Sequence, residues 1–420
     1  MNYDPFFARA AEHMHESAIR KMGTVGARIP DLISFAPGYP DPSTFPWQPL
    51  SAIAADLLDG SDLSALQYGP TRGFRPLLES LESVLAPRGI VSTFEQRLIT
   101  TGSQQGLDLI ARTLVDPGDV VLVELPTYTG AIAAFRNARA DLVGVPQDAD
   151  GISLDALDRA IGRARADGRR VRLLYLVPNF QNPTGLLIGL DKRARLLEWA
   201  ARADVLIVED DPYADLYFPD MASPADTRPI KADDREGRVI YLSSFSKTLA
   251  PGLRTAWLVA ADALTSKFDV AKQAMDLCTS GLDQRVVHQA VVRGVLSALA
   301  PALRANYQAK RQVMQDALSG ALGGLVSSTP PRGGFFLWAS LPPALDAERL
   351  LPRALQAAVT YVPGRAFFVD GGGANTLRLC FSQPSADRIR TGVARLAEAI
   401  RAELAQPPVS ADSGISTPSG

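Results

Sequence analysis

Lys247 lies in a hydroxyl-rich segment, Ser243–Leu249, which follows an apolar run and continues into Pro251–Arg254. A lysine amine with a lowered pKa can attack a carbonyl carbon and form a Schiff base. Taken alone, Lys247 is more simply interpreted as a solvated surface lysine. The groups that the fold places beside it therefore decide between the two interpretations.

Three further polar segments follow apolar runs. Asp210 comes just after the run Val205–Val208, and a carboxylate at the end of a buried strand needs a partner or a proton, unless it caps a helix. Gly102-Ser103-Gln104 is typical of a helix start, where free N–H groups and the helix dipole attract an anion, although a plain turn with a serine cap explains it equally well. Asn182 opens the turn Asn182–Gly185.

Between Phe94 and Ala260, short apolar runs alternate with longer helical patterns, and these elements position the polar segments. Short apolar runs without period-two alternation are typical of parallel strands buried on both faces, and helical patterns separate them. We expect an α/β fold whose large domain has a mostly parallel sheet sandwiched by helices. Ligands bind beyond the carboxyl ends of such strands, where the four polar segments lie. The expected strands are 97–101, 120–123, 172–177, 205–208 and 239–242.

The pattern changes after Leu264. Long helices are expected there, followed by short strands and a closing helix, which together predict a smaller α+β domain. Residues 407–420 are rich in Ser, Pro and Gly and indicate a disordered tail. The expected helices are 265–276, 284–299, 303–318 and 387–405, and the expected strands are 335–338, 361–362 and 377–381.

Composition excludes several classes of function. The 420 residues carry a net charge of −2, so no overall positive field favours nucleic acid or an anionic membrane. Cys278 and Cys380 are the only cysteines, too few for a disulfide framework or a four-cysteine zinc site, and we expect no metal. The N-terminus lacks an apolar signal region, and no apolar stretch is long enough to span a membrane.

Together, the four segments place a lysine, a carboxylate, an asparagine and a phosphate-binding helix start at one edge of a sheet. A pyridoxal phosphate site needs this set of groups. Its lysine bonds the aldehyde, its acid pairs with the ring nitrogen, and N–H, hydroxyl and guanidinium groups hold the phosphate.

From about residue 17 to residue 402, the chain resembles the fold-type-I pyridoxal-phosphate aminotransferases of class I and II. It is most similar to the branch of 2-aminoadipate, kynurenine and aromatic aminotransferases. The spacings agree with that branch, since Asp210 follows Asn182 by 28 residues and precedes Lys247 by 37. The resemblance implies that Lys247 forms the Schiff base, that Asp210 pairs with the ring nitrogen and that Tyr128 stacks on the cofactor, and it counts these three as catalytic.

The resemblance also implies ligand sets. The implied cofactor-binding residues are Gly102, Ser103, Gln104, Tyr128, Asn182, Asp210, Tyr213, Ser244, Ser246, Lys247 and Arg254, with Tyr68 reaching the phosphate of the partner subunit. The implied substrate-binding residues are Arg378, which would clamp the α-carboxylate, together with Asn182, Gly38 and Arg20.

In domain terms, the resemblance implies an N-terminal segment (1–45) that covers the active site and joins the small domain. A large cofactor-binding domain (46–290), a small α+β domain (291–406) and the tail (407–420) follow. We expect a cytoplasmic homodimer with shared active sites and no nucleic-acid or membrane partner.

The expected activity is transfer of an amino group from an L-amino acid (aminoadipate, aromatic, branched or apolar) to a 2-oxo acid, with 2-oxoglutarate as the expected acceptor. Two alternatives remain open at this point. One is another pyridoxal-phosphate reaction on the same fold, such as β-elimination or decarboxylation. The other is a non-enzymatic effector-binding domain of a transcription regulator, which would need a basic DNA-binding domain before it.

Overall fold

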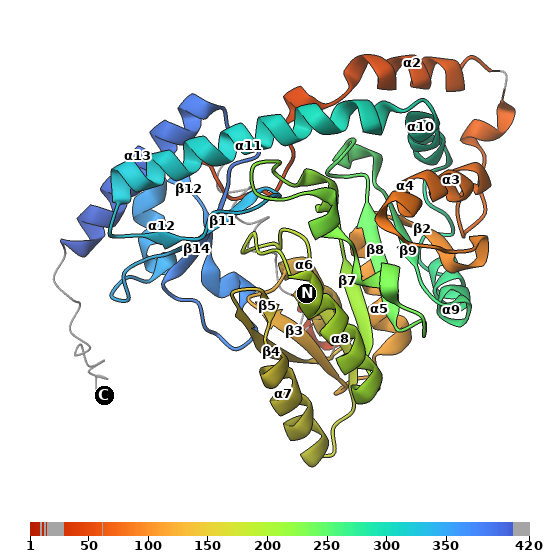
Figure 1. Cartoon of the computed structure of the whole chain (residues 1–420), viewed down its shortest axis with the longest axis horizontal. Helices are drawn as coiled ribbons and strands as arrows, with labels where there is room; N and C mark the ends of the chain where they lie inside the picture. Colours follow the sequence, from red (N-terminus) through yellow and green to blue (C-terminus); the bar gives the residue numbers. More distant parts are fainter. Residues whose placement is uncertain (9–10, 12–13, 15–28, 61, 406–420) are drawn as a thin grey trace.

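The computed structural model describes residues 1–8, 11, 14, 29–60 and 62–405 (Figure 1). Arg20 and the expected tail at 407–420 lie outside the described residues. The architecture is α/β, with a large mixed sheet flanked by helices and a smaller sheet beside it. The expected fold class is therefore confirmed.

Among the described residues, eight strands form the large sheet in the order β2-β9-β8-β7-β6-β3-β4-β5. Strands β8, β7, β6, β3 and β4 are parallel, β9 runs antiparallel to both β2 and β8, and β5 runs antiparallel to β4. The strands β4, β5 and β9 are additions to those expected from the sequence. The bounds are β2 Arg97–Thr101, β3 Val120–Leu125, β4 Asp141–Asp148, β5 Gly151–Ile152, β6 Val171–Leu176, β7 Leu206–Asp210, β8 Val239–Ser244 and β9 Thr255–Val259.

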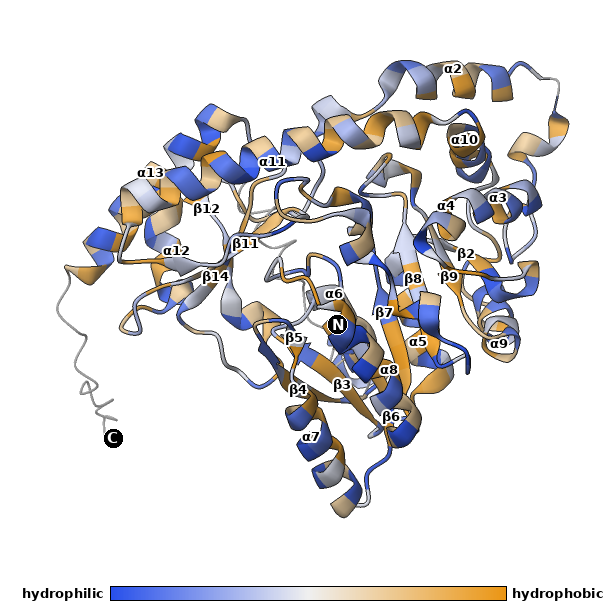
Figure 2. Ribbon diagram, viewed as in Figure 1, coloured by the Kyte–Doolittle hydropathy of each residue, from blue (hydrophilic) through white to orange (hydrophobic). Residues whose placement is uncertain are grey.

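Helices cover both faces of this sheet because successive strand side chains point to opposite faces. On β3, Val121 and Val123 pack in one core with α5 and α6, while Val120 and Leu122 pack in a second core with α7 and α8. Figure 2 shows hydrophobic residues concentrated on the strands, whereas the helices have a hydrophilic side. The bounds are α5 Ser103–Leu114, α6 Thr129–Asn137, α7 Leu154–Ala166 and α8 Leu190–Ala203.

A third core lies at the β2–β9 end of the sheet. Ile53, Leu77 and Val287 from the helices pack there with Tyr241 and Trp257 from the strands. The helices that contribute are α2 Trp47–Leu57, α3 Arg75–Ser80, α4 Glu82–Leu85 and α10 Gly281–Val292, and α9 Asp262–Gln273 packs on α5.

The smaller sheet is antiparallel, in the order β10-β11-β14-β13, and matches the expected α+β character of the C-terminal part. Helices α12 and α13 lie beside it (Figure 1). The N-terminal strand β1 pairs with β12, so that the segment from residue 33 onward runs beside the smaller sheet. The bounds are β1 Ile33–Ser34, β10 Ser327–Ser328, β11 Phe336–Ser340, α12 Ala347–Gln356, β12 Val359–Thr360, β13 Val362–Pro363, β14 Thr376–Cys380 and α13 Ala386–Leu404.

The long helices differ from expectation at one point. The sequence predicts separate helices over 284–299 and 303–318, and Pro301 lies in the gap between them. In the structure, α10 ends at Val292 and α11 runs through Pro301 from Val295 to Leu322. The break falls at Gly294 instead, because its φ of 71° is left-handed and ends a helix at little cost. Proline removes only one N–H from a long, packed helix. Figure 1 shows α11 running from α10 to α13 past both sheets.

Within the described part of the chain, no single helix is long and apolar enough to cross a membrane. The consecutive helices α10 and α11 reach the length and apolar composition of a membrane span only when they are taken together, and they are bent by 81° relative to each other.

Candidate cofactor and substrate site

Lys247 follows β8, in the turn after the last strand residue, Ser244. Its Nζ donates a hydrogen bond to the carbonyl oxygen of Gly38 at 3.0 Å and lies 5.8 Å from the ring centroid of Phe335. Burial of the amine lowers the pKa of Lys247 to about 8, and the positive charge of Arg378 acts in the same direction. A lysine with this pKa is partly neutral near pH 8 and is therefore a competent nucleophile.

Asp210 is the last residue of β7, the strand next to β8, and 3% of its surface is exposed. Its Oδ2 accepts a hydrogen bond from the Tyr175 hydroxyl at 2.9 Å, whereas its Oδ1 is buried and has no hydrogen-bond partner in the described structure. Burial raises the pKa of Asp210 to about 7. A cationic ligand at Oδ1 would satisfy this atom and favour the ionised carboxylate.

The start of α5 and the β8 loop form a cradle for an anion. Gly102 precedes the helix with a φ of 77°, and a Cβ there would lie 2.1 Å from Arg254 Nη2. Glycine is therefore required for the guanidinium to lie against the first helical turn. The Ser244 and Ser246 hydroxyls are hydrogen-bonded at 2.8 Å. Helix N–H groups, two hydroxyls and an arginine together suit a phosphate.

Two tyrosines belong to the site: Tyr128 lies beside Gln104 at the start of α5, and the Tyr213 ring centroid lies 6.0 Å from Lys247 Nζ. Tyr128 is the residue just before α6. A Cβ on Gly130 would lie 2.4 Å from the Tyr128 ring and 2.5 Å from Gln104 Oε1, so both side chains lie against this glycine. Gln104 Nε2 donates to the Gly130 carbonyl oxygen at 2.9 Å. Tyr213 is buried, and its ring meets Phe335 and Phe336 edge to face. Burial raises the pKa of the Tyr213 hydroxyl well above its usual value, so it remains a hydrogen-bond donor.

Arg378, on β14, brings the smaller sheet to the site. Its Nη1 donates to Asn182 Oδ1 at 2.6 Å, and its Nη2 donates to the carbonyl oxygen of Ala36. Its Nε is buried without a partner among the described residues, and the side chain is fully buried beneath the Phe336 ring, 4.4 Å from its centroid. A buried guanidinium with an unpaired N–H is a site for a carboxylate.

Gly38 contacts both Lys247 and Phe336, the ring that packs on Arg378. Its carbonyl oxygen accepts from Lys247, and a Cβ on it would lie 2.8 Å from the Phe336 ring. The segment reaches this position because Phe35 bonds both β12 and β14, through Thr360 and Cys380. No side chain fits at residue 38 unless Phe336 moves.

The structure therefore brings most of the expected residues together, and among the described ones Tyr68 stands apart. Tyr68 is 79% exposed in the loop after the short helix Leu63–Leu66 and makes no side-chain contact with this group in the described structure. Arg20 lies outside the described residues.

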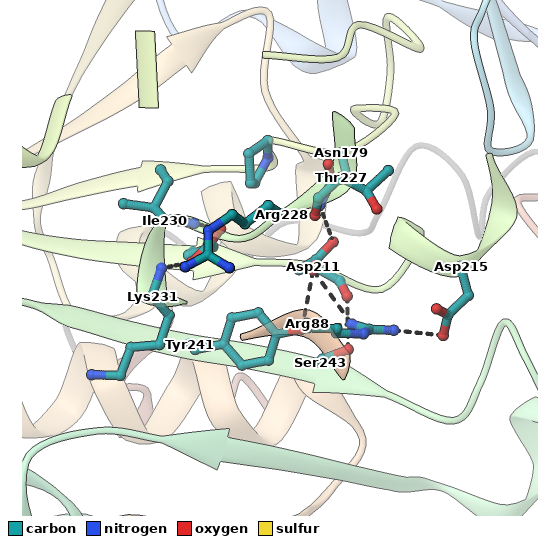
Figure 3. Close-up of polar contacts among 12 residues, drawn as sticks. Arg88, Asn179, Asp211, Asp215, Thr227, Arg228, Ile230, Lys231, Tyr241 and Ser243 are labelled. Atoms are coloured by element: carbon teal, nitrogen blue, oxygen red, sulfur yellow. Dashed lines mark hydrogen bonds and ion pairs between the residues drawn. The ribbon is translucent and has the colours of Figure 1, made fainter. Parts of the chain in front are cut away.

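Two buried groups escape the motif analysis. Tyr175, which donates a hydrogen bond to Asp210, lies inside an apolar run of the sequence. It could have been found there only because the hydroxyl of a tyrosine in a buried strand needs a hydrogen-bond partner. The other is Asp211, the residue after Asp210, together with its hydrogen-bond partners (Figure 3). Asp211 accepts from Asn179 Nδ2 at 2.8 Å and from the Tyr241 hydroxyl at 3.0 Å, and Arg88 Nη1 donates to the Tyr241 oxygen at 2.6 Å.

The model of the family described as "Aminotransferase class I and II" matches residues 31–396. The chain belongs to this aminotransferase family. It is 39% identical to aromatic-amino-acid aminotransferase 1 of Thermococcus litoralis over 405 residues, which cover 96% of each chain. Full-length similarity to such enzymes identifies the protein as a pyridoxal-phosphate-dependent transaminase.

Solved aminotransferase structures agree with the fold. Kynurenine aminotransferase of Pyrococcus horikoshii, in complex with PMP, superposes with a TM-score of 0.91 at 39% identity, covering 96% of this chain and 99% of that one. The α-aminoadipate aminotransferase LysN of Thermus thermophilus, complexed with N-(5'-phosphopyridoxyl)-L-leucine, has a TM-score of 0.88 at 39% identity and coverages of 96% and 100%. The aminotransferase fold and its cofactor, pyridoxal 5'-phosphate, follow for this chain.

The side chains present fit this cofactor. The unpartnered Asp210 Oδ1 suits a protonated ring nitrogen, and the Gly102–Arg254 cradle suits the phosphate. Lys247 has a lowered pKa and suits the aldehyde. Within the described structure no other buried lysine combines these features, because each of the other three has a carboxylate partner. Lys310 Nζ is paired with Asp41 at 2.5 Å, Lys272 Nζ with Asp276 at 2.6 Å and Lys192 Nζ with Asp148 at 3.3 Å.

Proposed function

We propose that this aminotransferase moves the amino group of an aminoadipate, aromatic, branched or apolar L-amino acid to 2-oxoglutarate by a ping-pong mechanism. The observation that supports the proposed chemistry is that the ends of the neighbouring strands β8 and β7 carry a lysine of lowered pKa and a buried carboxylate with one unpartnered oxygen. The similarity to an aromatic-amino-acid aminotransferase and an α-aminoadipate aminotransferase favours these donors.

In the proposed mechanism, Lys247, Asp210, Asn182 and Tyr213 hold the cofactor, and Ser103, Gln104, Ser244, Ser246 and Arg254 hold its phosphate, with Tyr128 stacked on its ring. Bound there, the cofactor supplies an electron sink for the bond broken at the substrate Cα. Arg378 binds the substrate α-carboxylate through its planar fork.

Proton transfer is assigned to Lys247. As a free amine, Lys247 Nζ would take the proton from the substrate Cα as a general base and deliver it to the C4′ carbon of the cofactor as a general acid. A pKa of about 8 suits both roles, because each protonation state is populated near neutral pH. The buried rings of Phe335 and Tyr213, whose centroids lie 5.8 and 6.0 Å from Nζ, give this amine an apolar surrounding.

A donor panel tests the proposed specificity. With 2-oxoglutarate fixed as the acceptor, we expect aminoadipate, aromatic and branched amino acids to react faster than small donors such as alanine or serine. The acceptor is tested with a series of 2-oxo acids at a fixed donor. Preference for alanine as donor together with glyoxylate as acceptor would contradict the proposal.

We infer that the enzyme works in the cytoplasm as a homodimer. The two-cysteine composition suits a reducing compartment. Leu63, Leu66 and Tyr68 lie close together in the sequence and are 88%, 76% and 79% exposed. Such exposed apolar side chains suit a second copy of the chain as partner, because large apolar patches mark interfaces.

Subunit mixing tests whether the sites are shared. We expect Tyr68→Ala and Lys247→Ala each to be inactive alone, because one weakens the partner's phosphate site and the other lacks the nucleophile. Hybrid dimers contain one intact site, formed by Lys247 of one subunit and Tyr68 of the other. Equal mixing with subunit exchange should restore about a quarter of wild-type activity. No restoration, despite exchange shown by native mass spectrometry, would contradict sharing.

Arg20 is proposed to bind a distal carboxylate of the substrate, although it lies outside the described residues. A dicarboxylate needs a second cation besides Arg378, because a buried unpaired carboxylate is strongly destabilising. We expect Arg20→Ala to lower kcat/KM for glutamate by about 30- to 150-fold, roughly 2–3 kcal/mol, and to change leucine little. The matched control is Lys21→Ala, which removes the adjacent positive charge. Equal losses on both donors would show that Arg20 is structural.

A further inference from the structure

Tyr175 bonds the carboxylate that the proposed function assigns to the cofactor's ring nitrogen. On the sheet, Tyr175 is paired with Val208, and Asp210 lies two residues further along β7, on the same face. The hydroxyl reaches Asp210 Oδ2 at 2.9 Å, while Oδ1 has no partner. The tyrosine is fully buried, and its ring is held edge to face by Phe135 on α6 at 6.0 Å.

We propose that Tyr175 is a positioning residue, which fixes the Asp210 carboxylate so that Oδ1 alone is presented to the cofactor's ring nitrogen. This inference rests on the proposed role of Asp210. A carboxylate with two unanchored oxygens could rotate about its Cβ–Cγ bond, whereas a hydrogen bond to one oxygen holds its plane. The Tyr175 ring cannot move along with a rotating carboxylate, because it belongs to a strand and Phe135 packs against it.

The same hydrogen bond favours the ionised form of Asp210. Burial raises the pKa of Tyr175 well above its usual value, so the hydroxyl keeps its proton throughout the working pH range. Its donated bond lowers the pKa of Asp210, opposing the burial that raises it. The other ionisable groups that act on this pair are Lys247, Asp211, Tyr128 and Glu124.

Tyr241 offers a matched control. It is also a fully buried strand tyrosine, on β8, and its hydroxyl bonds the adjacent carboxylate, Asp211. Asp211 also accepts from Asn179 and forms an ion pair with Arg88 at 3.4 Å (Figure 3), so it has no oxygen left for a ligand. Removing the Tyr241 hydroxyl therefore perturbs a structural network of similar burial.

The experiment compares Tyr175→Phe and Tyr241→Phe as cofactor-loaded enzymes. For Tyr175→Phe, we expect the Kd for pyridoxal phosphate to rise and kcat to fall, each by about 10- to 100-fold, with KM for the amino donor nearly unchanged. For Tyr241→Phe, we expect a lower Tm but nearly unchanged Kd and kcat. Equal changes in the two variants would overturn the inference.

A double-mutant cycle with Asp210→Ala separates positioning from folding, because alanine removes the group that Tyr175 bonds. If Tyr175 acts through the Asp210 carboxylate, Tyr175→Phe should cost little further cofactor affinity in the Asp210→Ala background. An equal loss in both backgrounds would overturn the inference, even if Tyr175→Phe is destabilised. Normal activity of Asp210→Ala itself would instead refute the proposed role of Asp210, so the two failures are distinguishable.

Discussion

Replacing Lys247 with alanine is expected to abolish turnover and the visible absorption band of the bound cofactor. The amine is the proposed site of covalent attachment and also the proposed carrier of the Cα proton. Loss of both roles should lower kcat/KM by about 10⁴-fold or more. The measurement is steady-state transamination together with an absorption spectrum of the dialysed enzyme.

Reduction with borohydride identifies the lysine directly. In the wild-type enzyme, peptide mapping should find the reduced cofactor on Lys247 and on no other lysine. Lys310 is the internal control, because it is buried but bonded to Asp41 at 2.5 Å and to the Ser382 carbonyl oxygen at 2.7 Å. A reducible linkage that persists in Lys247→Ala would remove the assignment.

Replacing Asp210 with asparagine should lower kcat by about 10³-fold or more, because an unprotonated ring nitrogen is a poor electron sink and the lost charge acts in a buried site. The substitution preserves shape and leaves an oxygen able to accept from Tyr175. We therefore expect a small change in Tm, which circular dichroism would measure beside the activity.

Glu209→Gln is the matched control for Asp210→Asn. Glu209 is the preceding, fully buried carboxylate on β7, and its oxygens accept from the backbone N–H groups of Ile230 and Lys231, each at 2.8 Å. This variant should lose about 1–3 kcal/mol of stability and keep most of its kcat. Near-normal activity of Asp210→Asn, or an equal loss in both variants, would contradict the assignment.

The sequence predicts the centre of the large sheet well. Runs such as 120–123 and 239–242 contain little but apolar residues because both faces of each strand are buried under helices, and that burial leaves a continuous hydrophobic pattern. The polar segments after these runs converge in the structure because parallel strands end at one edge. Lys247 and Asp210 were therefore predictable as neighbours from topology alone.

Other features depend on tertiary contacts that local patterns do not encode. Arg378 meets Asn182 across 196 residues of sequence, and only the family resemblance pointed to that pair. In the sequence pattern, Tyr175 cannot be distinguished from the apolar residues of the strand around it. The α10–α11 break was misplaced because Pro301 looks like a helix breaker, whereas the long packed helix tolerates it and Gly294 ends the preceding one.

The central claim is transamination, and a half-reaction with the amino donor alone tests it most directly. The enzyme is loaded with pyridoxal phosphate, mixed with 2-aminoadipate or phenylalanine in the absence of any 2-oxo acid, and the products are quantified. We predict release of about one equivalent of 2-oxo acid per active site, then a stop until 2-oxoglutarate is added, as a ping-pong mechanism requires. Continuous release of ammonia or carbon dioxide without an acceptor would contradict transamination and favour elimination or decarboxylation on the same fold.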